Sequence, residues 1–338
     1  MKRWLIGTLS AGLVLSAVVA CAVVQTATGL HGGKTAAGPA ITLNAKPVAL
    51  NNKDLKQDRS GDFLYAGGID VTSSDTGLLH GLSDLVITTD GSLVSESDEG
   101  RLFRAGLVLD AAGRLVGLNH GTLVPLTGLD GKALSSKEES DAEGVAVWPN
   151  GDVMVSFERD HRIWRYPAAG GPPVAMPIPV DPKMTGNEGM EGLALAPSQG
   201  PDAYWVGVEN GDIFLCRVAK ACERKASLPR PPDTYRLASL TETPDGQLVI
   251  LHDSWAALTG ARCRVSIIAM PGSDHPSVSD TLVLAPPQTT DNFEGVAAVM
   301  RPGGGLRIYL IVDDNFQATE RTLLMAFDRP PSPAGAAP

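Results

Sequence analysis

A pattern that recurs roughly every 50 residues constrains the fold of this chain more than any other feature. Each copy holds a short motif, an apolar-alternating run, a turn with Gly and often Pro, Asn or Asp, and a second apolar run that ends in an acid. The five copies run from Gly81 to Asp98, Asp141 to Glu158, Glu188 to Glu209, Leu237 to Asp253 and Asp291 to Asp313. Length alone would suggest two domains, but such repeats are typical of one propeller.

Turn sequences between the paired runs indicate that the runs are antiparallel strands. Examples are Asp90-Gly91, Asn150-Gly151 and Asp245-Gly246, and a third run such as Arg162 to Tyr166 often follows. Because no mature segment has a sustained helical period, we predict an all-β fold, a β-propeller with blades of about four antiparallel strands. Strand-like residues Phe63 to Val71 could pair with C-terminal strands, which favours six blades over the alternatives of five or seven.

The N-terminus predicts export. Lys2 and Arg3 precede an uncharged stretch that ends at Cys21, as in a secretory signal. The residues Val18-Val19-Ala20-Cys21 resemble the lipobox of bacterial lipoproteins, which predicts a lipid on Cys21, while ordinary cleavage a few residues later is the alternative. We therefore expect a signal peptide over 1–20, a flexible tether over 21–60, the propeller over 61–330 and a disordered tail over 331–338. The expected location is the periplasm or cell envelope, with a lipid anchor as the only membrane attachment.

The cysteines fit an oxidising compartment. Cys216 and Cys222 lie close enough across a predicted hairpin to form a disulfide, which leaves Cys263 unpaired. No Cys/His cluster has zinc spacing. The formal net charge is -10, which argues against nucleic acid and anionic membranes and suits cation binding.

The repeats predict a ring of carboxylates. In a propeller blade the first strand is innermost and the second returns antiparallel, so the start of one lies beside the end of the other. Three first strands open with Glu143, Glu191 and Glu294, and Ser83 and Ser239 hold the corresponding points of the other two. The second strands close with acids, so both sets are expected to face one mouth as two concentric rings; the closing acids are Asp98, Glu158, Glu209, Asp253 and Asp313. Carboxylates gathered at one channel mouth raise one another's pKa values unless a cation compensates. Ca2+, which takes six to eight oxygen ligands, is the expected ion.

Other interpretations of these residues remain open. The acids could cap turns or pair with Arg159 and Arg162. Each of three histidines near the same end could carry a proton, namely His80, His161 and His252. Four tryptophans fall in or beside strand runs and are expected to pack between blades rather than to stack on sugars, namely Trp148, Trp164, Trp205 and Trp255. The motifs of serine, zinc, phosphate-loop and dinucleotide enzymes are missing from the sequence.

Several motifs together resemble the phytase-like family, often named "esterase-like activity of phytase". They are Gly81-Leu82-Ser83-Asp84-Leu85, Asp141-Ala142-Glu143-Gly144, Phe157-Glu158-Arg159, Asn187-Glu188-Gly189-Met190-Glu191-Gly192 and Asp313-Asp314-Asn315-Phe316. The resemblance implies an exported propeller related to calcium-dependent phytases, in which calcium lets an acidic face hold a phosphate ester and activate water. The implied metal ligands are Asp141, Glu143, Glu158, Glu191, Glu294, Asp313 and Asp314. The implied catalytic residues are Glu158, Glu191, Glu294 and Arg159, with Arg159 as a clamp for phosphate or carboxylate.

One position departs from the family pattern. Where the family commonly has Asp-Arg-Gly, this chain has Asp98-Glu99-Gly100 and so lacks a cation that could hold substrate. Three functions therefore stay open: a calcium-dependent hydrolase of phosphate or carboxylic esters, a noncatalytic calcium-stabilised envelope binding protein, and a metal-dependent lactonase. We expect a monomer that acts on a small-molecule ester or phosphoester and binds no nucleic acid.

Overall fold

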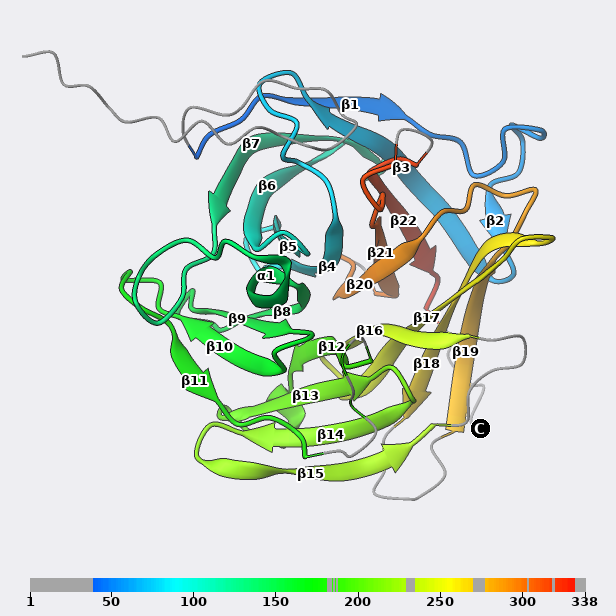
Figure 1. The fold of residues 1–338 in the computed structure, drawn as a ribbon. Helices are drawn as coiled ribbons and strands as arrows, with labels where there is room; N and C mark the ends of the chain where they lie inside the picture. The colour runs from blue at the N-terminus through cyan, green and yellow to red at the C-terminus, as the bar shows by residue number, and fades with distance from the viewer. Residues whose placement is uncertain are drawn as a thin grey trace, which may run out of the picture.

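The structure is a computed structural model that describes residues 39–180, 184, 186, 188–228, 235–269, 277–302, 304–317 and 320–331. In these residues, five antiparallel sheets surround a central axis. Figure 1 shows the five innermost strands, β4, β8, β12, β16 and β20, around that axis. The predicted all-β propeller is confirmed. The expected signal peptide, Cys21 and most of the expected tail lie outside the described residues.

The first four blades each contain four strands, and their order along the chain is also their order from the axis outward. Blade 1 comprises β4 (Leu82–Ile87), β5 (Ser92–Ser97), β6 (Arg101–Leu109) and β7 (Leu115–Pro125), and blade 2 comprises β8 (Ala142–Val147), β9 (Val153–Phe157), β10 (Arg162–Tyr166) and β11 (Val174–Met176). Blade 3 comprises β12 (Met190–Leu195), β13 (Ala203–Val208), β14 (Asp212–Arg217) and β15 (Lys220–Ser227), and blade 4 comprises β16 (Arg236–Glu242), β17 (Gln247–Ala256), β18 (Gly260–Ala269) and β19 (Ser277–Leu284). Two short helices, α1 (Lys137–Ser140) and η1 (Pro197–Gln199), lie in connections.

Blade 5 joins the two ends of the chain. Its C-terminal strands are β20 (Phe293–Met300), β21 (Leu306–Val312) and β22 (Leu323–Arg329), and its N-terminal strands are β3 (Phe63–Ser73), β1 (Leu43–Pro47) and the short β2 (Arg59–Ser60). The predicted pairing of residues 63–71 with C-terminal strands is confirmed, because β3 pairs with β22. The predicted blade number of six is wrong: the fifth repeat supplies only three strands, so β3 completes that blade instead of founding another.

The flexible tether predicted before residue 61 is contradicted by its described part. Strand β1 pairs with β3 along its whole length, from Leu43 opposite Ser73 to Pro47 opposite Ile69. The backbone N–H of Ile41 donates to Gly121 O at the edge of β7, in blade 1. Residues 39–47 therefore bridge the outer edges of blades 1 and 5, because β3 and β7 would otherwise leave backbone groups unpaired there.

The hydrophobic core is divided among the faces between blades. Five clusters of buried apolar side chains each join neighbouring blades, such as the cluster of Val145 and Val94 between blades 1 and 2. Trp148 and Trp205 are buried as expected. Trp255 is 69% exposed near the β17–β18 turn, so the expectation that all four tryptophans pack between blades is wrong for it.

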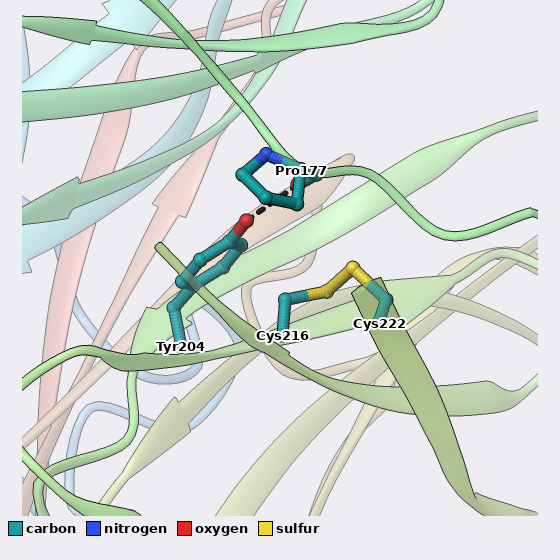
Figure 2. Close-up of a disulfide and its surroundings, with 4 residues drawn as sticks. All are labelled: Pro177, Tyr204, Cys216 and Cys222. Atoms are coloured by element: carbon teal, nitrogen blue, oxygen red, sulfur yellow. Dashed lines mark hydrogen bonds between the residues drawn. A yellow bond between two sulfur atoms is a disulfide. The ribbon is translucent and has the colours of Figure 1, made fainter. Parts of the chain in front are cut away.

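The predicted disulfide is present. Cys216 of β14 and Cys222 of β15 are bonded, and Cys263 is free and buried. Figure 2 shows the bond beside Tyr204, whose hydroxyl donates to the carbonyl of Pro177.

Among the described residues, no helix has the length and apolarity needed to cross a membrane.

Candidate functional site

Each innermost strand starts with a β-bulge. In all five, the register with the second strand skips one residue, so two residues of the inner strand oppose one of its partner. The skipped residues are Ser83, Glu143, Glu191, Ala238 and Glu294. Ala238, and not the predicted Ser239, therefore corresponds to the glutamates in blade 4. The bulge explains why the prediction was wrong by one residue, because an extra residue shifts by one position which side chains of the strand point to which face.

The five bulge residues line one cavity, together with Leu237 and three charged residues, Glu209, Arg236 and Asp253. The structure thus brings Glu143, Glu191 and Glu294 together at one channel mouth. The cavity has a volume of about 30 Å³. Since one water molecule needs about 10 to 15 Å³ by this measure, the cavity has room for an ion with a water but not for an organic molecule.

The three glutamates are strongly destabilised as anions. Burial, followed by the neighbouring carboxylates, raises the pKa of Glu143 and of Glu191 well above the usual range. Burial, followed by Asp253, raises the pKa of Glu294 to about 8, although Asn292 Nδ2 donates to its Oε1 at 2.6 Å. A bound cation would remove this repulsion.

A second grouping extends the site toward the rim of blade 2. Asp141, Glu143 and Glu158 each offer a carboxylate oxygen within 4.8 Å of the others, so this cluster could hold a metal ion. Burial, followed by the Asp141 carboxylate, raises the pKa of Glu158 to about 7. Asp141 also forms ion pairs with Lys137 and with the predicted clamp residue Arg159. The alternative that some of these acids pair with neighbouring basic residues thus holds for Asp141.

Two basic side chains at the mouth were not predicted. Arg236 Nη1 lies 2.9 Å from Glu209 Oε1, and its Nη2 lies 3.2 Å from Asp253 Oδ2. Lys137 Nζ lies 2.7 Å from Asp98 Oδ2. Arg236 could have been found from the sequence. It lies two residues before the bulge residue Ala238, as Asp141 lies two residues before Glu143. At this position blade 4 therefore has a basic residue where blade 2 has an acidic one.

Asp313 and Asp314, both predicted ligands, do not line the small cavity. Asp313 Oδ1 accepts from the N–H of Asn315 at 2.8 Å, and burial, followed by Glu294, raises its pKa. Asp314 is fully buried and accepts from Gly81 N–H at 3.1 Å and from Thr322 Oγ1 at 2.7 Å. The contacts of Asp314 fasten blade 5 to blade 1.

Asp84 lies at the centre of a hydrogen-bond network that the repeat pattern did not predict. Its Oδ1 accepts from Ser239 Oγ at 2.7 Å and its Oδ2 from Val145 N–H at 3.1 Å, while Val296 N–H donates to Ser239 Oγ at 3.2 Å. The network links the inner strands of blades 1, 2, 4 and 5. The sequence did contain an indication of this network, because Asp84 is an acidic residue at the position where the second repeat has Gly144.

Glu96 lies beside Asp84 on the neighbouring strand β5. It is fully buried, and in the described part of the chain neither carboxylate oxygen has a hydrogen-bond partner. Burial, followed by the Asp84 carboxylate, raises the pKa of Glu96 well above its usual range. The acidity of the mouth therefore continues into the propeller interior.

The three histidines lie in separate environments. His80 is buried, 3.6 Å from Glu99 Oε2 and edge-on to the ring of Phe316. Burial, followed by Arg264, lowers the pKa of His252 to about 4, so it is neutral at physiological pH. His161 lies against Gly189, as does Glu158. None of the three lines the small cavity.

Comparison with protein families identifies the chain. A model of the phytase-like family, described as esterase-like activity of phytase, matches residues 78–316. The chain belongs to this family. The matched region extends from just before blade 1 to just after β21 and so contains the whole acidic mouth. No curated protein matches the sequence.

Solved structures that match this chain include a gluconolactonase from Xanthomonas campestris, with 15% identity, a TM-score of 0.41, and coverage of 86% of this chain and 98% of that chain. A virginiamycin B lyase from Staphylococcus aureus has 11% identity and a TM-score of 0.40, covering 85% and 99%. An aldose sugar dehydrogenase from Streptomyces coelicolor has 14% identity and a TM-score of 0.42, covering 86% and 99%. At TM-scores below 0.5, these likenesses say nothing about activity.

Proposed function

We propose that the protein is a metal-dependent ester hydrolase whose active site is the acidic channel mouth. One observation carries the proposal: three bulges aim Glu143, Glu191 and Glu294 into one cavity. Among the described residues, no ion pair reaches any of the three. A cation would stabilise such partly buried, mutually repelling carboxylates.

Ca2+ is the ion that these residues suit best. The cavity offers carboxylate and hydroxyl oxygens and, among its lining residues, no His or Cys that would favour zinc. A bound cation supplies Lewis-acid polarisation of an ester and lowers the pKa of a water. In the proposed site, Glu143, Glu191 and Glu294 hold the ion.

Two residues at the rim complete the proposed chemistry. Glu158 accepts a proton from the attacking water at its carboxylate, since burial and the neighbouring Asp141 carboxylate raise its affinity for a proton. Arg159, with a third of its side chain exposed, donates hydrogen bonds to the oxygens of the ester group and so orients it. The family description, which names an esterase-like activity, supports ester hydrolysis.

A second function is favoured by the size of the cavity. A volume of about 30 Å³ suits an ion that only stabilises the propeller, with binding of a partner elsewhere on the surface. In that case calcium raises the melting temperature and no ester is hydrolysed. Hydrolysis of lactones in preference to phosphate and carboxylic esters would instead indicate a lactonase.

The test is turnover of phosphate, acetate and lactone esters with calcium and with chelator, by wild type and by Glu191→Gln/Glu294→Gln. We predict that chelation abolishes turnover, and that the double variant loses at least about 100-fold in kcat/KM, because two ligands lose their charge. The control Asp62→Asn/Glu223→Gln removes two exposed carboxylates elsewhere and should match wild type. Near wild-type turnover by the glutamate double variant would contradict the site.

Export and a lipid anchor on Cys21 belong to the same proposal. The disulfide between Cys216 and Cys222 supports an oxidising compartment. We expect the protein from a bacterial membrane fraction to carry a lipid mass that Cys21→Ala removes. Recovery of the wild type without lipid, wholly in the soluble fraction, would contradict the anchor.

A further inference from the structure

We propose that a cavity beside the acidic mouth binds an uncharged, hydroxyl-rich part of the substrate, so that the substrate is an ester of a sugar and not a polyphosphate. This inference rests on the proposed ester hydrolysis. The cavity, which we call the blade 2 cavity, has a volume of about 440 Å³ and is lined by residues 128–130, 132–135, Glu139, Asp160, Arg162 and Trp164. Its volume lies within the roughly 300 to 1,000 Å³ of small-molecule sites.

The blade 2 cavity adjoins the candidate metal cluster. Glu139 lies two residues before Asp141, and Asp160 lies two residues after Glu158. Arg162 ties these segments together, because its Nη1 donates to Asp160 O at 2.8 Å and its Nη2 donates to Glu139 O. The cavity is therefore built from segments that directly flank the cluster, whereas the 30 Å³ cavity is too small to hold an organic molecule.

The walls of the blade 2 cavity offer both stacking surfaces and hydrogen-bonding groups. Trp164 of β10 lines it, and Leu129 is 58% exposed. The guanidinium of Arg162 lies 4.3 Å from the Trp164 ring centre and 4.0 Å from that of Phe157, so it is held in place. Apolar side chains beside carboxylate acceptors match a sugar ring, which has apolar faces and a rim of hydroxyls.

The charge of the cavity decides between sugar and polyphosphate. Three carboxylates, Asp130, Glu139 and Asp160, face two cations, Lys132 and Arg162. Lys132 Nζ already lies 3.1 Å from Asp130 Oδ2, and Arg162 is occupied by the carbonyls and lies 3.5 Å from Asp160 Oδ2. The excess of carboxylates repels an anion but accepts hydrogen bonds from neutral hydroxyls.

The test is calorimetric titration of the chelated protein with 6-O-acetylglucose and, separately, with inositol hexakisphosphate. Chelation prevents turnover, so the titration reports binding alone. We expect saturable binding of 6-O-acetylglucose and weaker or no binding of the polyphosphate. Glu139→Gln and Asp160→Asn should each weaken binding of the sugar ester by at least about fivefold, because each loses a charge-assisted acceptor. Glu223→Gln, an exposed change on β15, is the matched control and should bind as wild type does.

The outcomes separate this inference from the proposed activity. Tighter binding of inositol hexakisphosphate, or equal binding of 6-O-acetylglucose by wild type and both variants, would overturn the sugar assignment while calcium-dependent ester turnover could still stand. Normal binding of 6-O-acetylglucose by a protein that hydrolyses no ester with calcium would leave the cavity assignment intact and contradict the hydrolase instead. Both acids are exposed, so their variants are expected to fold.

Discussion

Individual residues at the mouth set its charge balance. Blade 4 differs from blades 2, 3 and 5, because Ala238 stands at the bulge and Arg236 lies two residues before it. The guanidinium holds two carboxylates, Glu209 and Asp253, that would otherwise add to the repulsion in the cavity. Arg236 therefore acts as a fixed counter-charge on one side of the proposed cation site.

Replacing that counter-charge should make the protein depend more on calcium. In Arg236→Gln, we expect the chelated protein to melt at least about 5 °C lower than wild type, because two buried carboxylates lose their partner. Calcium should restore more stability to this variant than to wild type, since two further ligands become available. Melting curves with and without calcium check this. An equal calcium-induced shift in variant and wild type would contradict the role of Arg236.

The structural elements were predictable to different degrees. Repeats and turns indicated the inner strands and their order, because a period-two pattern and a Gly turn are local features. The bulges were not predicted, and they explain why Ser239 was assigned in place of Ala238. Nothing in the sequence indicated that residues 43–47 would pair with β3, since the pairing is with a strand of another segment and depends on where the ring closes.

Residues 39–47, which bridge blades 1 and 5, should stabilise the closed ring. A chain that begins at residue 48 lacks β1 and the Ile41 contact with blade 1, so it exposes the outer edges of two blades. We expect it to melt roughly 5 to 10 °C below a chain that begins at residue 39, and to aggregate more readily. Thermal unfolding of the two chains, both without the preceding residues, checks this. Identical melting would show that residues 39–47 do not hold the ring closed.

The stability of the whole molecule should depend on pH, because carboxylates at the channel mouth have raised pKa values in the folded state. In the absence of cation, Glu158 and Glu294 keep protons in the folded state up to pH values of about 7 and 8, whereas in the unfolded chain they titrate near 4.5. The folded state thus binds more protons, and stability falls as pH rises through the folded pKa values. His252, with a folded pKa of about 4, acts in the opposite direction only below about 6.5.

The informative window is therefore about pH 6.5 to 8.5, where His252 no longer contributes. We expect the chelated protein to lose at least about 4 °C in melting temperature across this window. Glu294→Gln should flatten the dependence, because the amide does not titrate. Calcium should stabilise more at the upper end, since it binds the deprotonated carboxylates. A chelated protein that becomes more stable across the same window would contradict the assignment of these pKa shifts.

The most direct test of the central claim is calorimetric titration of Ca2+ into the wild-type protein and into Glu191→Gln/Glu294→Gln at about pH 8.5, above the pKa of about 8 of Glu294. If the acidic mouth is a cation site, wild type binds calcium saturably and the double variant loses at least about tenfold in affinity or shows no heat at that site. If wild type binds no calcium, or if both proteins bind it equally, the ring of glutamates is not the cation site and the proposed hydrolase loses its basis.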